Sequence, residues 1–304
     1  MSDAGSNSGP EGARERQPDG GTVEATGIGF GRERPDRRSR LGAVRTVARR
    51  EYRIAARNRR EIGLAALFAV FAVGVVAFAA LRPDARHDVV VASLVELGIY
   101  LVPLVALVVG YDTVVGPEES GTLDTLLALP VTRGTVLVGT VLGRASVLCG
   151  AALVGLGLGG VAATILLGSA GVAAYGRFVL VATATAAAFL ALSVLVSTLA
   201  REKTRALGAA LGLWVWFVLL HDLLAIGVAA ALRPPGPVVA VLALANPLDV
   251  FRLLALRGLD TVPVGFAAAA SGVGLSTPIL VAALAVWIGL PVVVAARAME
   301  RRRL

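Results

Sequence analysis

The sequence contains very few of the residues on which catalytic and redox chemistry usually depends. Its one cysteine, Cys149, excludes a disulfide within the chain. Its one lysine, Lys203, follows Glu202, so the Gly-Lys-Ser/Thr sequence of a phosphate-binding loop occurs nowhere in the chain. Its two histidines, His87 and His221, do not form the His-Glu-x-x-His motif of a zinc hydrolase. We therefore expect no catalytic, cofactor-binding or metal site, and no enzyme activity of its own.

Apolar residues are abundant and are gathered in long runs. They make up 56% of the 304 residues, and the mean hydropathy is +0.77. Six runs reach the roughly 20 residues that cross a bilayer as a helix, and none has the alternation of a barrel strand. The sequence therefore predicts an all-α, polytopic membrane protein whose spans cover residues 62–81, 89–110, 138–167, 178–199, 206–231 and 278–296.

The chain divides by composition into three parts. Residues 1–40 are rich in Gly, Ser, Pro and charged residues and have almost nothing to bury, which predicts a disordered tail. The first apolar run begins only after residue 60, so this tail is not a secretory signal peptide. A basic segment follows at 41–60, and the six-span membrane domain takes up 61–304.

The basic segment 41–60 has seven arginines and a single acidic residue, Glu51. Its apolar residues recur at helical spacing: Leu41, Val44, Ala48, Tyr52 and Ala55. This pattern predicts an amphipathic helix that lies on the membrane, with its arginines against anionic lipid headgroups. Nucleic-acid binding is the alternative explanation of the arginines, and we disfavour it because a membrane span follows immediately.

The distribution of Lys and Arg predicts the orientation of the spans. With the N-terminus inside, the inner segments hold 23 of these residues and the outer segments six. Cytoplasmic segments carry the excess in membrane proteins. We therefore expect a multi-pass protein of the cell membrane with both termini, and residues 116–133, on the cytoplasmic side.

Residues 116–133 form a polar insert between two apolar runs. Pro117 suits the first position of a short helix, Glu118 and Glu119 suit its positive end, and Pro130 ends it. Three leucines at positions i, i+3 and i+4 make one apolar stripe: Leu123, Leu126 and Leu127. The segment is either an ordinary loop helix or a helix through which a cytoplasmic partner moves the spans.

Three ionisable residues fall inside predicted spans: Glu96, His221 and Asp222. Charged groups are costly in lipid and usually face the interior of a helix bundle, so each is a functional candidate. The structural alternative is that Asp222 pairs with His221 near the outer interface and that Glu96 pairs with an arginine.

The outer segment at about 232–277 contains a short helix with complete signals at both ends. Asn246 is a good N-cap, Pro247 fits the first turn, Asp249 can cap it, and Gly258 ends it. Several residues of this helix are too apolar for free solvent: Val250, Phe251, Leu254 and Leu256. We expect the helix to lie in the membrane interface or to contact a partner.

Residues 118–123, Glu-Glu-Ser-Gly-Thr-Leu, and 126–133, Leu-Leu-Ala-Leu-Pro-Val-Thr-Arg, resemble the coupling-helix signature of ABC-2 type transporter permeases. The resemblance covers about residues 41–304. It implies six helices per subunit, a homodimer, an elbow helix at 41–60, and a separate ATPase subunit that holds ATP and Mg. The residues that it assigns to ATPase coupling are Glu118, Glu119, Gly121, Thr122, Leu123, Leu126, Leu127, Pro130 and Arg133.

The outer motif Asn-Pro-x-Asp-x-Phe-Arg at 246–252 resembles the permeases of this family that are associated with nitrous-oxide reductase maturation and copper-site assembly. The resemblance implies an extracytoplasmic accessory protein, with contacts at Asn246, Pro247, Asp249, Phe251 and Arg252. Copper needs Cys, Met or His ligands, and the predicted spans hold only Cys149 and His221. We therefore expect any link to copper to run through partner proteins.

The resulting hypothesis is a membrane subunit that couples ATP hydrolysis in a partner to export or to mechanical transmission. The alternatives are a general exporter of a drug, lipid or other hydrophobic compound, a self-contained intramembrane enzyme, and an anchor without transport. An intramembrane enzyme needs a cluster of His, Glu and Asn on facing helices, and two histidines argue against it.

The orientation is testable with reporter fusions. Reporters fused after Arg303 or within residues 200–205 are expected to report the cytoplasm, because arginines surround both positions. A reporter near residue 260 is expected to report the outside. A cytoplasmic signal at residue 260 would contradict the six-span topology.

Overall fold

A computed structural model of the chain describes residues 42, 44–49, 60–82, 85–119, 133–261 and 263–301. The chain separates into two compact units, Met1–Pro35 and Asp36–Leu304, and every described residue belongs to the second. The predicted tail 1–40, most of the predicted elbow helix and residues 120–132 therefore lie outside the described residues. The described residues form an almost entirely helical fold and contain no strand.

Six helices in the described part of the chain are long and apolar enough to cross a membrane, which confirms the predicted fold class. α2 is Arg60–Ala80, and α3 (His87–Gly110) continues through a turn into α4 (Val115–Glu119). α6 is Arg133–Leu167, α7 is Val172–Leu199, and α13 is Thr277–Arg301. The fifth span combines α8 (Lys203–Val215), a π-helical turn (Trp216–Leu220) and α9 (His221–Leu232). Two shorter helices, α10 and α11, would make a seventh span if they counted as one.

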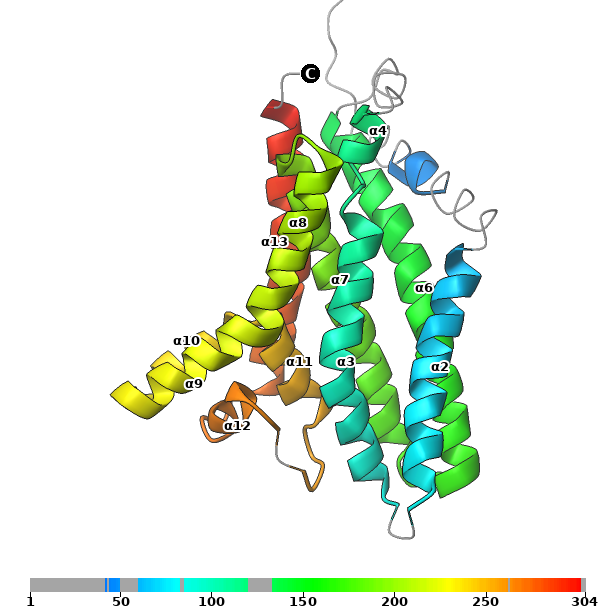
Figure 1. Cartoon of the computed structure of the whole chain (residues 1–304), viewed down its shortest axis with the longest axis vertical. Helices are drawn as coiled ribbons and strands as arrows, with labels where there is room; N and C mark the ends of the chain where they lie inside the picture. Colours follow the sequence, from blue (N-terminus) through cyan, green and yellow to red (C-terminus); the bar gives the residue numbers. More distant parts are fainter. Residues whose placement is uncertain are drawn as a thin grey trace, which may run out of the picture. The chain divides into compact units, whose positions relative to one another are not determined.

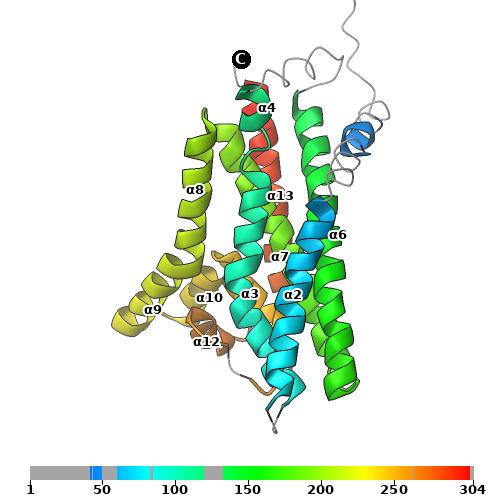
Figure 2. The same ribbon diagram turned by 45° about the vertical axis from the view of Figure 1, so that its right-hand side comes forward.

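α7 is the central helix of the bundle. It packs against α3, α6 and α13, and Figures 1 and 2 show these helices around it. In its most apolar stretch 67% of the residues are buried, against 22% in α2 and α13. Phe178 and Phe189 on α7 are fully buried, so this helix supplies much of the core.

α2 packs along α6, and two glycines of α6 allow the close approach. A Cβ on Gly155 would lie 2.5 Å from the Cβ of Phe68, and one on Gly159 would lie 2.5 Å from the Cβ of Ala72. The spacing is the Gly-x-x-x-Gly pattern that lets two membrane helices pack with their backbones close together. Both views show α2 beside α6 over its length (Figures 1 and 2).

The fifth span changes direction at the π-helical turn. Within the turn Phe217 and Val218 are buried, and the Phe217 ring packs edge-on against Phe189, at 5.8 Å between centroids, and Trp287, at 5.4 Å. Beyond the turn α9 leaves the line of α8 (Figure 1). π-helical turns often mark functional sites, and this one directly precedes His221 and Asp222.

The segment after α9 folds back against the bundle, an arrangement that the sequence did not predict. α10 (Gly236–Leu244) and α11 (Pro247–Ala255) meet at an angle of 103°, as a broken span or re-entrant loop. α11 packs on α7 and α13, and α12 (Phe266–Ser271) packs against it. Asn246 caps α11 as predicted, since its side chain accepts a hydrogen bond from the Leu248 N–H at 3.0 Å.

Several segments that are distant in sequence meet at one end of the bundle. α4, the start of α8 and the last turns of α13 lie there together (Figures 1 and 2). The helical residues 44–49 reach α6 at the same end, where a Cβ on Gly139 would lie 2.6 Å from the Cβ of Val47. The predicted elbow segment therefore contacts the third span through its described residues.

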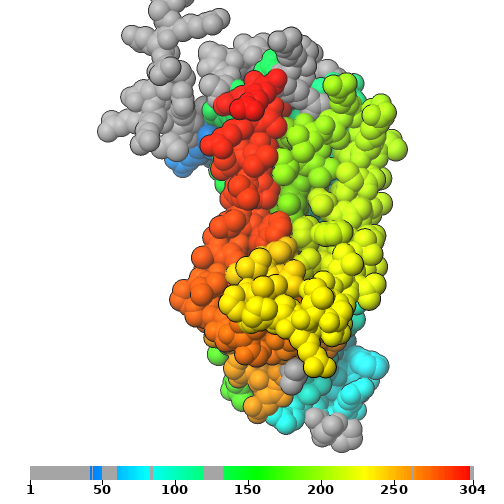
Figure 3. Space-filling model, turned by 90° about the vertical axis from the view of Figure 1, so that its left-hand side faces the viewer, coloured from blue at the N-terminus to red at the C-terminus, as the bar shows by residue number. Residues whose placement is uncertain are grey.

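The outward faces of several helices are apolar, as expected for a surface in lipid. Val70 and Phe78 on α2 are largely exposed, and so are Leu223 on α9 and Val241 on α10. Figure 3 shows α9 and α10 in yellow, in front of the orange α12 and the lower part of α13. These side chains need a nonpolar environment, whether lipid or another chain.

The α2–α6 contact predicts a position-specific effect of glycine substitution. Gly155→Val is expected to lower the stability of the detergent-solubilised protein by about 1–3 kcal/mol, because the new side chain must displace α2. Gly157→Val is the matched control, since a Cβ there meets nothing within 4 Å. Thermal unfolding followed by size-exclusion chromatography measures both, and equal melting temperatures would contradict the close packing.

Candidate functional site

The predicted coupling segment is described only at its two ends. α4 begins at Val115, so the prediction that Pro117 is the first helical residue is wrong by two positions. The helix starts earlier because the chain runs on from α3 through a hydrogen-bonded turn, in which Gly116 N–H bonds the Asp112 carbonyl. Glu118 and Glu119 end α4, and Arg133 begins α6. The remaining predicted coupling residues lie outside the described residues: Gly121, Thr122, Leu123, Leu126, Leu127 and Pro130.

The turn between α3 and α4 is attached to α6 by one arginine. The Arg144 Nη1 donates to Asp112 Oδ1 at 2.6 Å and to the Val109 carbonyl oxygen at 2.7 Å. Both charged side chains are largely buried, at 19% and 29% exposure. A carbonyl at the C-terminal end of a helix has no partner within the helix, so Arg144 satisfies one of them while it pairs with a carboxylate.

The same turn is attached to α7 and α8 by hydrogen bonds to its backbone and side chains. Ser197 on α7 accepts from the N–H groups of Val114, at 3.0 Å, and Val115, at 3.3 Å. The backbone N–H of Lys203, at the start of α8, donates to Glu119 Oε1 at 2.8 Å. We call Asp112, Glu119, Arg144, Ser197 and Lys203 the coupling junction. Its contacts attach α4 and the turn before it to three spans, α6, α7 and the start of α8.

A second polar group lies inside the membrane domain near the opposite end. We call it the charge cluster, and its members are Glu96, His221, Asp222, Asp249 and Arg252. Arg252 is at its centre, with Nη1 2.9 Å from Asp222 Oδ2 and 3.5 Å from Asp249 Oδ1, and Nε 3.3 Å from Glu96 Oε2. The arginine is 6% exposed, and Asp249 is fully buried.

The charge cluster is positioned by α11 and by the Asn246 cap. The Asn246 Nδ2 donates to the Phe217 carbonyl oxygen at 3.0 Å and lies 3.2 Å from His221 Nδ1. The Phe217 carbonyl belongs to the π-helical turn, so the turn, the cap and the histidine form one hydrogen-bonded unit. The Asn-Pro-x-Asp-x-Phe-Arg motif therefore supplies the capping Asn246 and two members of the cluster, Asp249 and Arg252, within about two helix turns.

The structure changes one expectation about these residues. Asp222 pairs with Arg252 rather than with His221, whereas the expected pairing of Glu96 with an arginine is confirmed. The predicted contact of the 246–252 motif with an accessory protein stays a prediction. The five motif side chains are buried within the chain: Asn246, Pro247, Asp249, Phe251 and Arg252.

A glycine covers the charge cluster from the side of α12. Gly265 has a φ of +72°, and a Cβ there would press on Asp222 Oδ2 and lie 3.2 Å from Arg252 Nη1. Only glycine combines this backbone conformation with so close an approach. The segment that leads into α12 therefore shields the Asp222–Arg252 pair.

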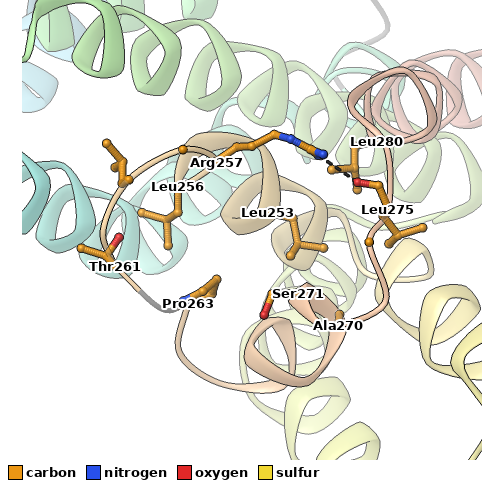
Figure 4. A pocket seen from close by; sticks show the side chains of 12 residues that line it. Leu253, Leu256, Arg257, Thr261, Pro263, Ala270, Ser271, Leu275 and Leu280 are labelled. Atoms are coloured by element: carbon orange, nitrogen blue, oxygen red, sulfur yellow. Dashed lines mark hydrogen bonds between the residues drawn. The ribbon is translucent and has the colours of Figure 1, made fainter.

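A cavity of about 300 Å³ lies beyond α11, between the chain that leaves it, α12 and the start of α13. Figure 4 shows Leu253, Leu256 and Leu280 around it, with Thr261 and Ser271 as polar groups. The Arg257 Nη1 donates to the Leu275 carbonyl oxygen at 2.8 Å (Figure 4). This bond joins two of the segments that line the cavity, the end of α11 and the chain before α13. The cavity has mainly apolar walls and no carboxylate, so it is separate in chemistry from the charge cluster.

Sequence reasoning assigned no role to Asp112 and Ser197 and did not pair Arg144 with either. A signal was present for the charges, since Asp112 lies just beyond the predicted second span and Arg144 lies within the third. Their pairing is set by the packing of α3 against α6. The two residues are 32 positions apart in the sequence, and no helical or strand periodicity predicts a contact over that separation.

Comparison with known proteins places the chain among membrane transporters. The family model described as "ABC-2 family transporter protein" matches residues 45–304. A Pseudomonas aeruginosa protein named "Probable ABC transporter permease protein NosY" is 38% identical over 278 residues, covering 86% of this chain and 99% of the relative. A Stutzerimonas stutzeri protein of the same name is 34% identical over 276 residues, covering 87% of this chain and 100% of the relative.

The charge cluster predicts a large effect of removing its arginine. Arg252→Gln is expected to destabilise the solubilised protein by about 3–5 kcal/mol, because three carboxylates lose their shared partner in a buried position. Arg233→Gln, at an exposed arginine after α9, is the control and is expected to change stability by less than about 0.5 kcal/mol. Adding Asp222→Asn to the Arg252→Gln variant is expected to restore part of the loss. Equal thermal stability of the two single variants would contradict the central role of Arg252.

Proposed function

This chain belongs to the ABC-2 family of transporter proteins, and we propose that it is the membrane subunit of an ABC transporter driven by a separate ATPase chain. Its relatives are named as permeases, which agrees with a subunit that does not itself hydrolyse ATP. ATP and Mg would bind to the partner, because this sequence has no phosphate-binding loop. Both termini and the 116–133 segment would lie in the cytoplasm, where the ATPase is.

The coupling junction is the observation that carries this proposal. The segment that resembles a coupling helix starts from a turn that is attached to α6, α7 and α8 by the contacts of Arg144, Ser197 and Lys203. These attachments give a partner that binds the coupling segment a direct connection to three spans. Closure of the ATPase on its nucleotide would push the coupling segment, and the push would be shared by three spans.

We propose that the stripe of Leu123, Leu126 and Leu127 fills an apolar groove on the ATPase. Glu118 and Glu119 would contact the rim of that groove, and Arg133 would flank it. The permease would act as a homodimer, as the ABC-2 family resemblance implies, with one ATPase chain on each coupling segment. The spans would then move relative to one another and change the outer face.

We further propose a role in the maturation of nitrous-oxide reductase and its copper sites. The support is the resemblance of the 246–252 motif, together with two relatives named NosY. The alignment with this chain covers almost the whole length of both. The predicted spans hold only Cys149 and His221 as copper-type ligands. A copper pathway across the bilayer is therefore poorly supported, and transmission of motion to an extracytoplasmic accessory protein fits the chain better.

The proposal is tested by separating ATPase binding from transmission. In a mild-detergent pull-down, Leu126→Asp is expected to weaken ATPase association by about 2–4 kcal/mol, because a charge would enter an apolar groove. Thr125→Asp is the matched control, since residue 125 lies about 200° around the expected helix from Leu123. Loss of the ATPase in both variants would point to general misfolding of the segment. Full retention in Leu126→Asp would remove the docking role.

Transmission is measured in the same complex with a fluorophore at the far end of the spans. The label is attached to Ser169→Cys in a Cys149→Ser background, because Ser169 is exposed between α6 and α7. Arg144→Gln is expected to keep the ATPase bound but to lose the change in fluorescence on ATP binding. A normal nucleotide response in Arg144→Gln would show that the coupling junction does not transmit the motion.

A further inference from the structure

The charge cluster contains more negative than positive groups. Three carboxylates, those of Glu96, Asp222 and Asp249, share one guanidinium, that of Arg252. With all of them ionised and His221 neutral, the formal charge of the cluster is −2. Uncompensated charge within a membrane domain is expensive, so a buried group of this kind needs a further positive partner.

Each of the three carboxylates has one oxygen without a partner. Among the described residues, no hydrogen-bond donor reaches Glu96 Oε1, Asp222 Oδ1 or Asp249 Oδ2, and all three atoms are buried. Arg252 binds the other oxygen of each carboxylate. The arginine therefore orients the three groups and leaves a second set of oxygens available. The side chain of Asp249, which carries one of these oxygens, is completely buried.

His221 stands beside the free oxygen of Asp249. Its Nδ1 is 3.7 Å from Asp249 Oδ2, and one nitrogen or oxygen of each of His221, Asp222 and Asp249 lies within 4.8 Å of the others. The amide nitrogen of Asn246, which is 3.2 Å from Nδ1, can only donate. Nδ1 therefore faces Asn246 with a lone pair, in the neutral form of imidazole that ligates metals.

A proton shared between the Asp222 and Asp249 carboxyl groups is the alternative to a cation, since ligand atoms of the two groups lie within 4.8 Å of each other. Such a proton does not involve His221, because the Asp249 oxygen is 3.7 Å from the imidazole nitrogen and a hydrogen bond from a carboxyl group spans about 2.5–3.0 Å. A cation placed among the donors would instead contact several of them at once, at bond lengths of about 2.0–2.2 Å.

We propose that His221, Asp222 and Asp249 bind one divalent first-row transition-metal cation, Mn²⁺ or Zn²⁺. Two carboxylates and one imidazole make a ligand set of oxygen and nitrogen that suits these ions and offers no thiolate or thioether for Cu⁺. A charge of +2 cancels the formal −2 of the cluster. Glu96 supplies a nearby carboxylate from α3 that adds to the negative field.

The surrounding residues fit a shell that holds the ligands in place. Arg252 fixes both aspartates through one oxygen of each and leaves the other oxygen free, as outer-shell partners of metal ligands commonly do. Gly265 closes the site from the side of α12. The 26% exposure of Glu96 and 15% exposure of Asp222 leave one side from which a cation can enter. Metal ligation at Nδ1 would replace the contact with Asn246, whose amide keeps its bond to the Phe217 carbonyl.

This site departs from the expectation of no metal ligands, and it is independent of the proposed ATPase coupling. Sequence spacing could not show it, because His221 and Asp222 belong to the fifth span and Asp249 to α11. The 103° bend before α11 is what turns Asp249 toward them. A cation here would link α9 to α11, and Arg252 would connect both to α3.

The test uses the full-length chain, with an affinity tag that contains no histidine, in lipid nanodiscs and without nucleotide. Mn²⁺ is titrated and the free ion is followed by its electron paramagnetic resonance signal, and Zn²⁺ is then added as a competitor. We expect saturable binding of one Mn²⁺ per chain and its displacement by Zn²⁺. The variants Asp222→Asn and Asp249→Asn are expected to weaken binding at least tenfold, which is the order seen for losses around metal sites.

Asp260→Asn is the matched control, because that side chain is 88% exposed and lies outside the cluster. It is expected to bind Mn²⁺ as the unaltered chain does. The measurement on the unaltered chain decides the proposal even if the cluster variants fold poorly. Absence of saturable Mn²⁺ and Zn²⁺ binding would overturn it, as would equal loss of binding in Asp260→Asn. Stabilisation of the unaltered chain by acidification, with no cation bound, would assign the missing positive charge to protons instead.

Discussion

The interaction on which the membrane domain most depends is the set of ion pairs around Arg252. One guanidinium joins Glu96 on α3, Asp222 on α9 and Asp249 on its own helix, within an interior that offers little water. The pairs are possible only because α11 folds back at 103° and carries Arg252 into the bundle. Without them, α11 would bring a buried charge and a capped helix end into lipid at a cost that apolar packing alone does not offset.

The charge cluster contacts the middle of α3 through Glu96, and the coupling junction begins just beyond the C-terminal end of the same helix at Asp112. Glu96 and Asp112 are separated along α3 and its terminal turn by about 24 Å, from a rise of about 1.5 Å per residue. α3 packs on the deeply buried α7 through Gly110, where a Cβ would lie 2.7 Å from the Cβ of Ser193. Pro103 lies on α3 between the two groups and removes one backbone hydrogen bond of the helix there, so a bend of α3 at this residue would change the distance between them.

The outer motif illustrates how a sequence pattern can be correct in its local structure and misleading in its environment. Asn246 caps α11 and Pro247 occupies the first turn, as the pattern predicts. The same residues are buried, because the π-helical turn supplies the Phe217 carbonyl as a partner for Asn246 and places His221 beside it. Capping depends on neighbours along the chain, whereas burial depends on which other helices pack there.

The sequence was enough to predict the fold class and the six long apolar helices, because a helix that crosses lipid must satisfy its own backbone and needs a long apolar run. It also identified Glu96, His221 and Asp222 as exceptional, since a charge within such a run stands out locally. The tertiary structure alone decided that these residues share Arg252, that Asp249 joins them, and that Arg144 reaches Asp112. Those contacts connect positions 30, 32 and 156 residues apart. They follow from the approach of helices through small residues and from one sharp bend, which depend on shape complementarity between distant segments rather than on periodicity within one.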